Sequence, residues 1–160
     1  MILDIRKTLW VPKPFRQGEM WDDIYQAAQK GPIQIKFISR ALNIHIYEKS
    51  VQEAMSNINS IFSVPNKLSF ERLKEVTAPA TLNVIICELK YKGGYQQGNS
   101  LYIDPETIGY FPQVVAHELG HGIFGPGHHY YRSYNCIMHA NGTQPQLCKL
   151  HKKRLECLLK

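Results

Sequence analysis

Residues 114–129, with the sequence VVAHELGHGIFGPGHH, contain the pattern that decides the fold of this chain. Apolar residues recur there at helical spacing, and two histidines, His117 and His121, lie four positions apart. Side chains four positions apart project from the same face of a helix, one turn above the other. The two imidazoles can therefore hold one metal ion, with Glu118 beside them on the same helix. These residues predict a helix that carries a metal site.

The chain continues from this helix into a glycine-rich turn at residues 125–127, which must end the helix. His128 and His129 follow the turn, and either can return to the metal as a third ligand; we favour His128. Catalytic zinc takes three protein ligands and leaves one position for water, whose pKa it lowers to roughly 7. In zinc peptidases with this HExxH order, the glutamate after the first histidine is the general base. We therefore expect a zinc-dependent peptidase that hydrolyses peptide bonds by attack of zinc-bound water, with Glu118 as general base.

This arrangement resembles the metzincin clan of zinc peptidases, whose pattern HExxHxxGxxH is followed by a methionine in a tight turn below the metal. The matching residues are His117, Glu118, His121, Gly125, His128 and, as the candidate methionine of the Met-turn, Met138. Gly125 and His128 each lie one position later than in the clan pattern, and Phe124 stands in the glycine position. The resemblance implies an α+β (α/β mixed) fold. It would have a small mixed twisted sheet, an active-site helix, and a short C-terminal subdomain with the Met-turn and a final helix.

Within the clan, the C-terminal residues are most similar to the archaemetzincin family, in which four cysteines hold a second, structural zinc. Cys136 precedes Met138 by two residues, as one of those cysteines does. The later C-x-x-C of the family corresponds to a C-x-x-H here, and His129 stands where the family has its first cysteine. The resemblance therefore implies a second, structural zinc bound by His129, Cys136, Cys148 and His151. Free thiols or a disulfide are the alternative for Cys136, Cys148 and Cys157.

The composition fits one globular domain. The chain has 160 residues, 44% of them hydrophobic, which is enough for a core without disulfides. We expect a single metallopeptidase catalytic domain over residues 1–160, with an upper subdomain over about 1–125 and a lower one over about 126–160.

The sequence contains no apolar run of about 18 residues, which is the length that would indicate a membrane span. No signal peptide is visible either. A cytoplasmic protein or an excised mature domain is therefore expected. The net charge of +6 is better explained by a solvated C-terminal helix face than by nucleic-acid binding.

The remaining pattern places strands and helices around the metal helix. Alternating apolar residues predict a strand at residues 33–38 and a second strand, or a continuation of the first, at 42–47. A nearly continuous apolar run predicts a strand at residues 82–91, and another strand follows at 100–104. Helical spacing predicts helices at residues 19–30, at 51–62 behind a capping box of Ser50 and Glu53, at 69–76, and at about 146–159. The segment over residues 95–104 is the candidate for an edge strand that pairs with the backbone of a peptide substrate.

Two other functions compete with a peptidase. Some small metal-dependent endoribonucleases share an H-x3-H-x5-H helix, but that helix has no glutamate after its first histidine, so Glu118 counts against them. A non-catalytic zinc-binding module is the other alternative, because the spacing of Gly125 and His128 departs from the clan pattern. We expect a peptide or protein substrate, no membrane partner, and zinc as the cofactor.

Overall fold

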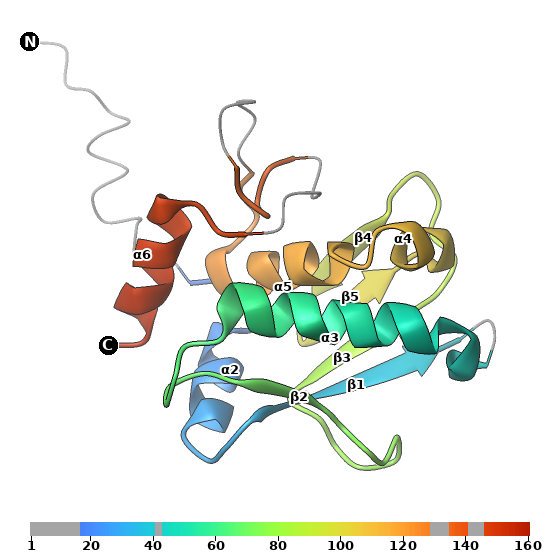
Figure 1. Cartoon of the computed structure of the whole chain (residues 1–160), viewed down its shortest axis with the longest axis horizontal. Helices are drawn as coiled ribbons and strands as arrows, with labels where there is room; N and C mark the ends of the chain where they lie inside the picture. Colours follow the sequence, from blue (N-terminus) through green and yellow to red (C-terminus); the bar gives the residue numbers. More distant parts are fainter. Residues whose placement is uncertain (1–16, 41–42, 129–134, 141–145) are drawn as a thin grey trace, which may run out of the picture.

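The computed structural model describes residues 17–40, 43–128, 135–140 and 146–160, which form a five-stranded sheet with helices packed against it (Figure 1). The strands are β1 (Ile33–Ser39), β2 (Phe70–Arg72), β3 (Leu82–Ile86), β4 (Gly94–Gln97) and β5 (Ser100–Ile103). Their order is β2-β1-β3-β5-β4, and β4 is the one strand among them that runs antiparallel to its neighbour. The expected α+β fold with a small mixed sheet is confirmed.

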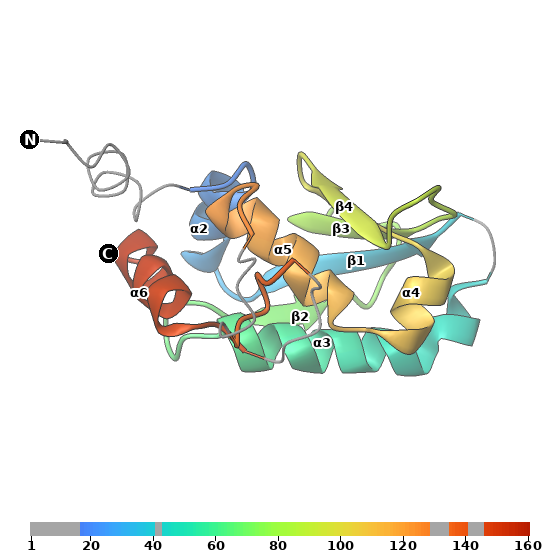
Figure 2. The same cartoon turned by 90° about the horizontal axis from the view of Figure 1, so that it is seen from above.

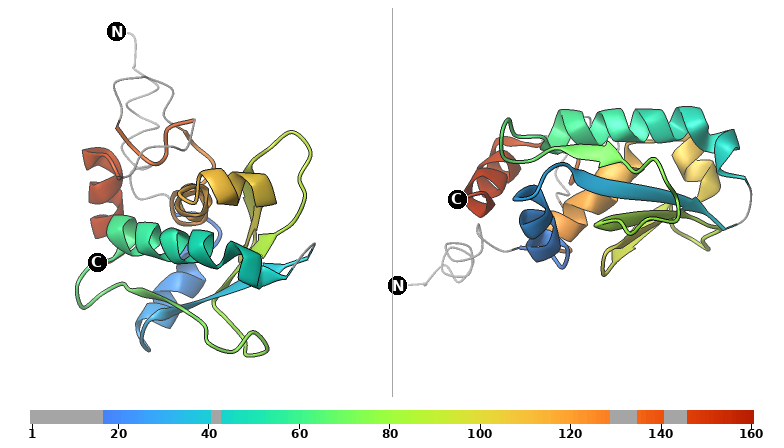
Figure 3. Two further views of the ribbon diagram at one scale, coloured as in Figure 1. Left: turned by 45° about the vertical axis from the view of Figure 1, so that its right-hand side comes forward. Right: turned by 90° about the horizontal axis from the view of Figure 1, so that it is seen from below.

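The metal helix is one of two helices that pack side by side on one face of the sheet. The α-helices are α2 (Trp21–Ala28), α3 (Glu48–Phe62), α4 (Pro105–Tyr110), α5 (Val114–Phe124) and α6 (Lys149–Leu158). α3 and α5 lie side by side on this face, whereas α4 and α6 lie at opposite ends of the molecule (Figures 1 and 3). α5, which carries the HExxH residues, therefore lies between α3 and the edge strand β4 (Figure 2).

The hydrophobic core fills the space between the sheet and these two helices. Alternate residues of β1, including Ile35 and Phe37, are buried there, as the period of two in the sequence predicts. α3 contributes Ile58 and Phe62 at helical spacing. Full burial of one such side chain contributes about 1.5–3 kcal/mol. This packed layer holds α5 in a fixed position against the sheet.

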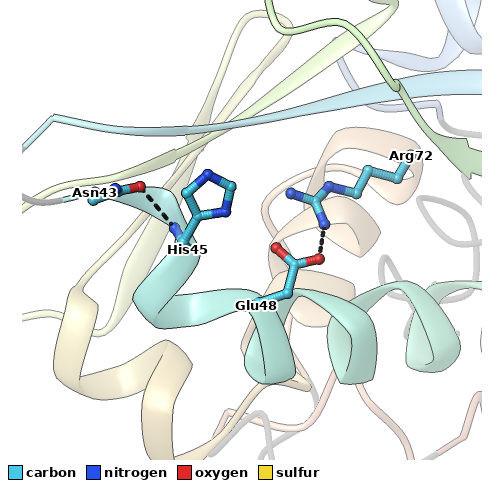
Figure 4. A network of polar contacts seen from close by, with 4 residues as sticks. All are labelled: Asn43, His45, Glu48 and Arg72. Carbon is cyan, nitrogen blue, oxygen red and sulfur yellow. Dashed lines mark hydrogen bonds and ion pairs between the residues drawn. The ribbon is translucent and has the colours of Figure 1, made fainter.

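The prediction of a strand at residues 42–47 was wrong, because residues Ile44–Tyr47 form a 3-10 helix, η2. The side-chain oxygen of Asn43 accepts a hydrogen bond from the backbone N–H of His45 at 3.0 Å (Figure 4). Asparagine often bonds a backbone group two residues further on, and this local bond competes with strand formation.

The prediction of a helix at residues 69–76 was also wrong, because β2 lies there and pairs with β1 in parallel register. Tertiary pairing therefore overrides the local helical pattern. Arg72 of β2 forms an ion pair with Glu48, the first residue of α3 (Figure 4). Because α3 begins at Glu48 without a side-chain cap, Ser50 and Glu53 do not form the predicted capping box.

Other elements were predicted correctly in type but not in extent. The strand predicted to reach residue 91 ends at Ile86, and the backbone N–H of Leu89 donates to the carboxylate of Asp104 at 3.0 Å. The helices predicted at residues 19–30 and 146–159 are shorter at both ends, as α2 and α6. In the ranges that the structure describes, no helix has the length and apolar character needed to cross a membrane.

Candidate metal centre and substrate cleft

The helix α5 is almost wholly buried, which fixes the side chains that it carries. His117 is only 5% exposed and Glu118 only 6%. The helix ends at Phe124 and is capped by Gly125, whose positive φ of 96° favours glycine because a side chain would be strained there. The chain therefore turns at residues 125–127, as the sequence predicts, and His128 follows the turn.

The structure brings His128 to the two histidines of α5. The Nε2 atom of His117 lies 3.2 Å from that of His121 and 3.2 Å from that of His128, and the third distance is 2.9 Å. Two nitrogen ligands of a tetrahedral zinc, each 2.0–2.1 Å from the ion, are about 3.4 Å apart. The three nitrogens therefore have nearly the spacing of zinc ligands. His129, the alternative third ligand, lies outside the described residues.

Backbone carbonyls hold the opposite nitrogen of two of these rings. Nδ1 of His117 donates to the carbonyl oxygen of Ile137 at 2.6 Å, and Nδ1 of His121 donates to that of Gly125 at 2.9 Å. A carbonyl oxygen only accepts, so each Nδ1 carries the ring proton and each Nε2 presents a lone pair to the cluster. Lone pairs converging at these distances repel one another unless a cation lies between them. The geometry therefore fits a metal ion.

The pKa values of all three imidazoles are lowered, chiefly by burial. The pKa of His117 falls to about 4, because burial disfavours its charged form more strongly than the bond to Ile137 favours it. The pKa values of His121 and His128 are lowered for the same main reason. The three rings are therefore neutral near pH 7, which is the state in which imidazole binds a metal. Zinc is among the ions that prefer such ligands.

Glu118 lies beside the cluster, between α5 and β4. Burial raises the pKa of its carboxyl group to about 7, and the positive charge of Lys92 opposes part of this rise. A Cβ atom on Gly94 of β4 would lie 3.1 Å from Cγ of Glu118, so glycine at this position leaves room for the carboxyl side chain. A buried carboxyl with a pKa near 7 at a cleft has the properties of a general acid or base.

An open cleft of about 270 Å³ connects the histidines with the edge strand. It is lined by Gly94, Tyr95, Gln96, Glu118, His121, Pro126 and His128. A larger hollow of about 370 Å³ lies next to the turn after α3, but no histidine, cysteine or carboxylate lines it. A hollow of about 450 Å³ beside the start of α4 is lined by the carboxylates Glu88, Asp104 and Glu106, but by no histidine or cysteine. The combination of histidines and a glutamate in the lining, rather than the volume, therefore marks the first cleft as the candidate site.

The segment at residues 95–104, expected as one edge strand, belongs to a hairpin of two strands. β4 lies at the edge, and β5 lies inside the sheet between β4 and β3. Tyr95 and Tyr102 face each other across this pair, with ring centroids 4.6 Å apart. Cross-strand aromatic pairs of this kind stabilise the pairing of two strands. Of the two strands of this hairpin, β4 is therefore the one at the edge of the described sheet, where a ligand can pair with it.

Met138, the candidate for the Met-turn, is fully buried against α5. A Cβ atom on Gly120 would lie 2.2 Å from Sδ of Met138, so the methionine occupies the space that a side chain at position 120 would need. Ile137, the residue before it, is the one whose carbonyl oxygen holds His117. The turn at residues 136–139 thus contacts the metal helix at two adjacent points.

Alanine in place of Gly120 should destabilise the protein by about 1–3 kcal/mol, because the added methyl group forces Met138 to move within a packed core. Urea denaturation of the metal-free protein measures this change. Gly109→Ala in α4 is the matched control, since a Cβ atom there meets nothing within 4 Å. That variant should be neutral or gain up to about 1 kcal/mol. Equal stability of the two variants would contradict the contact.

A second group of metal-binding side chains lies at the start of α6. Nδ1 of His151 is 3.5 Å from Sγ of Cys136 and 3.3 Å from Sγ of Cys148. Sulfur and nitrogen ligands of a tetrahedral zinc are about 3.6 Å apart. Three of the four ligands expected for a second zinc therefore lie together, while His129 is outside the described residues. Cys157 is not part of either cluster found among the described residues.

The fold has a counterpart among solved structures. No family model matches this chain, and no curated protein matches it in sequence. The crystal structure of archaemetzincin from Methanopyrus kandleri matches it with a TM-score of 0.57, over 80% of this chain and 96% of that chain. The fold of this chain is archaemetzincin-like. The sequence identity is 14%, and at this level the likeness extends to the fold alone.

Within this archaemetzincin-like fold, three features of the site have no signal in the sequence. They are the carbonyl groups of Ile137 and Gly125, which fix the histidine rings, and the charge of Lys92 near Glu118. A backbone carbonyl carries no residue-specific signal, and Lys92 is one lysine among many. The histidines and the glutamate themselves are recognisable from their spacing.

Proposed function

We propose that this protein is a zinc-dependent peptidase in which His117, His121 and His128 hold the catalytic ion and Glu118 is the general base. The observation that carries the proposal is the convergence of three neutral imidazole nitrogens next to a buried carboxyl group. A non-catalytic zinc-binding module needs only the imidazoles. A carboxyl group with a pKa near 7, beside them in an open cleft, is what a hydrolase needs in addition.

Zinc in such a site supplies Lewis-acid polarisation and lowers the pKa of water to roughly 7. Glu118 accepts the proton of the attacking water and passes it to the leaving amine. Its burial supports this role, because a carboxyl group with a raised pKa is a stronger base than an exposed one. The carbonyl bonds to His117 and His121 keep both rings oriented throughout the reaction.

The edge strand β4 is the proposed binding site for the substrate backbone. One side of β4 pairs with β5, and none of the described strands pairs with its other side. An extended peptide can therefore add to this side by main-chain hydrogen bonds. Gly94, Tyr95 and Gln96 of β4 line the same cleft as Glu118, so a peptide paired there passes next to the general base.

We also propose a second, structural zinc bound by Cys136, Cys148 and His151, with His129 as the fourth ligand. The spacing of the three described ligand atoms supports this site. Burial raises the pKa of the Cys136 thiol to about 11, so ion binding should displace its proton. Cysteines that serve as ligands fit a reducing, cytoplasmic compartment, where disulfides are rare.

The test is zinc-dependent cleavage of peptides by protein purified without a metal-binding tag. The zinc-loaded protein should cleave members of a mixed peptide library, with the cut positions read by mass spectrometry. A chelator should stop cleavage, and added zinc should restore it. Stoichiometric zinc with no cleavage in a broad library would leave the non-catalytic module, and cleavage of RNA instead would favour the endoribonuclease alternative.

A further inference from the structure

A short segment just before α2 holds the end of the metal-bearing helix. The backbone N–H of Gly18 donates to the carbonyl oxygen of Ile123 at 2.7 Å, and that of Met20 donates to the carbonyl oxygen of Gly122 at 2.9 Å. Carbonyl groups in the last turn of a helix have no partner within the helix itself. These two bonds therefore fix the end of α5 immediately after His121.

The two backbones approach so closely that position 18 requires glycine, and the side chain of Met20 fills the space beside Gly122. A Cβ atom on Gly18 would lie 2.4 Å from the carbonyl oxygen of Gly122, and one on Gly122 would lie 2.2 Å from Sδ of Met20. Distances this short do not occur for real side chains. The segment is therefore packed directly against the end of α5.

Glu19, between these two residues, reaches the other wall of the cleft. Its Oε2 atom accepts hydrogen bonds from Nε2 of Gln96 at 2.8 Å and from the backbone N–H of Gly98 at 3.1 Å. Gln96 belongs to β4 and lines the cleft, and Gly98 lies in the turn between β4 and β5. One carboxylate oxygen of Glu19 therefore links the edge strand β4 to the segment that holds the end of α5.

A second bond next to this one holds the same turn. Oδ2 of Asp23, in the first turn of α2, accepts a hydrogen bond from Nδ2 of Asn99 at 2.7 Å. The turn itself needs Gly98 in a left-handed conformation, with φ of 57°. β4 has only four residues and an unpaired outer side among the described strands. Such a short edge strand needs contacts outside its own ladder to keep a fixed position.

We propose that Glu19 is a positioning residue that sets β4 at a fixed distance from the metal helix, so that the strand is ready to pair with an extended peptide. The proposal rests on the peptidase function proposed above. The backbone N–H groups of Gly18 and Met20 bond the segment to α5. The carboxylate of Glu19 accepts hydrogen bonds from Gln96 and Gly98, and so connects the same segment to β4 and its turn. A strand that is already ordered loses less conformational entropy when the peptide binds.

The test compares two zinc-binding ligands on the zinc-loaded protein. A tripeptide hydroxamate can bind zinc and also pair with β4, whereas acetohydroxamate can bind zinc only. Glu19→Ala should weaken the tripeptide hydroxamate roughly three- to tenfold, the range expected for loss of about one hydrogen bond. The affinity for acetohydroxamate should stay the same. Backbone amides at positions 94–98 should exchange hydrogen for deuterium faster in the variant, with or without zinc.

Two variants separate positioning from folding. Glu19→Gln keeps a side-chain oxygen as acceptor and should restore both the affinity and the slow exchange. Glu53→Ala removes an exposed glutamate from α3 and should change neither. Equal zinc content and melting temperature in all variants exclude a folding defect as the cause.

Three outcomes would overturn the proposal, and they differ in what they overturn. Unchanged exchange at positions 94–98 in Glu19→Ala would show that Glu19 does not hold β4. Faster exchange with unchanged affinity for the tripeptide hydroxamate would reject only the role of Glu19 in peptide binding. If the wild-type protein binds both hydroxamates equally well, the tripeptide does not pair with β4 and the proposal fails, whereas the peptidase function itself is judged by cleavage of the peptide library.

Discussion

Glutamine in place of Glu118 should lower kcat for peptide hydrolysis by about 100- to 10,000-fold, the usual contribution of a general base. The amide has nearly the same shape as the carboxyl group but cannot accept the proton of the attacking water. Zinc content should be unchanged, because the ligand cluster consists of three histidines and Glu118 is not one of its members. Steady-state kinetics on a cleaved library peptide, with zinc measured by elemental mass spectrometry, checks both statements.

The same substitution should change stability in a direction that depends on pH. Burial raises the pKa of Glu118 from its ordinary 4.5 to about 7, so the folded state binds more protons than the unfolded state between these pH values. The wild-type protein without metal therefore loses stability as pH rises from about 4.5 through 7. Glu118→Gln does not carry this cost, and above pH 7 it should be more stable by up to about 3 kcal/mol. Denaturation at pH 5 and pH 8 gives the comparison.

Glu53→Gln is the matched control, since it neutralises an exposed glutamate on α3. It should keep full activity and follow the wild-type dependence of stability on pH. Residual activity above one tenth of wild type in Glu118→Gln would contradict the role of general base. A stability difference that does not grow with pH would contradict the raised pKa.

Alanine in place of His151 should reduce the zinc content from two ions per chain to one, because one of the two ligand clusters loses an imidazole. The loss should also lower the melting temperature markedly, since structural zinc contributes much of the folding energy of the residues around it. His151 is 4% exposed, and its ring packs against Phe124 at the end of α5, with centroids 4.8 Å apart. Loosening of α6 should therefore also affect the position of α5, the metal helix.

Two further variants separate loss of zinc from loss of packing. His151→Cys keeps a zinc-binding side chain and should retain both ions. His45→Ala removes an exposed histidine outside both clusters and should leave zinc content and melting temperature unchanged. Two zinc ions in His151→Ala, or one in the wild-type protein, would reject the second site. The cysteines near it would then be free thiols or a disulfide, and the catalytic site would be unaffected.

The sequence alone determined the parts of this protein that depend on local periodicity. The spacing of His117 and His121, with Glu118 between them, predicts a helix with a metal-binding face, and α5 is that helix. The alternation over residues 33–38 likewise predicts β1. These predictions succeed because one face of each element is buried, and burial imposes its period on the sequence.

Local patterns failed where a distant partner decides the conformation. Residues 69–76 read as a helix, but pairing with β1 makes β2 a strand. Residues 42–47 read as a strand, but the side chain of Asn43 starts a 3-10 helix. In both cases a few hydrogen bonds outweigh a weak local preference, which is worth only tenths of a kcal/mol per residue.

The tertiary structure alone decided how the site is assembled. It brought the Nε2 atom of His128 to those of the helix histidines through the turn at Gly125, while His129, the other candidate in the sequence, lies outside the described residues. It also brought the carbonyl group of Ile137 to His117, from 20 residues further along the chain. Sequence spacing records which side chains can bind a metal. Which of them meet depends on how the chain packs, because the contacts that fix them are made by backbone groups that every residue carries.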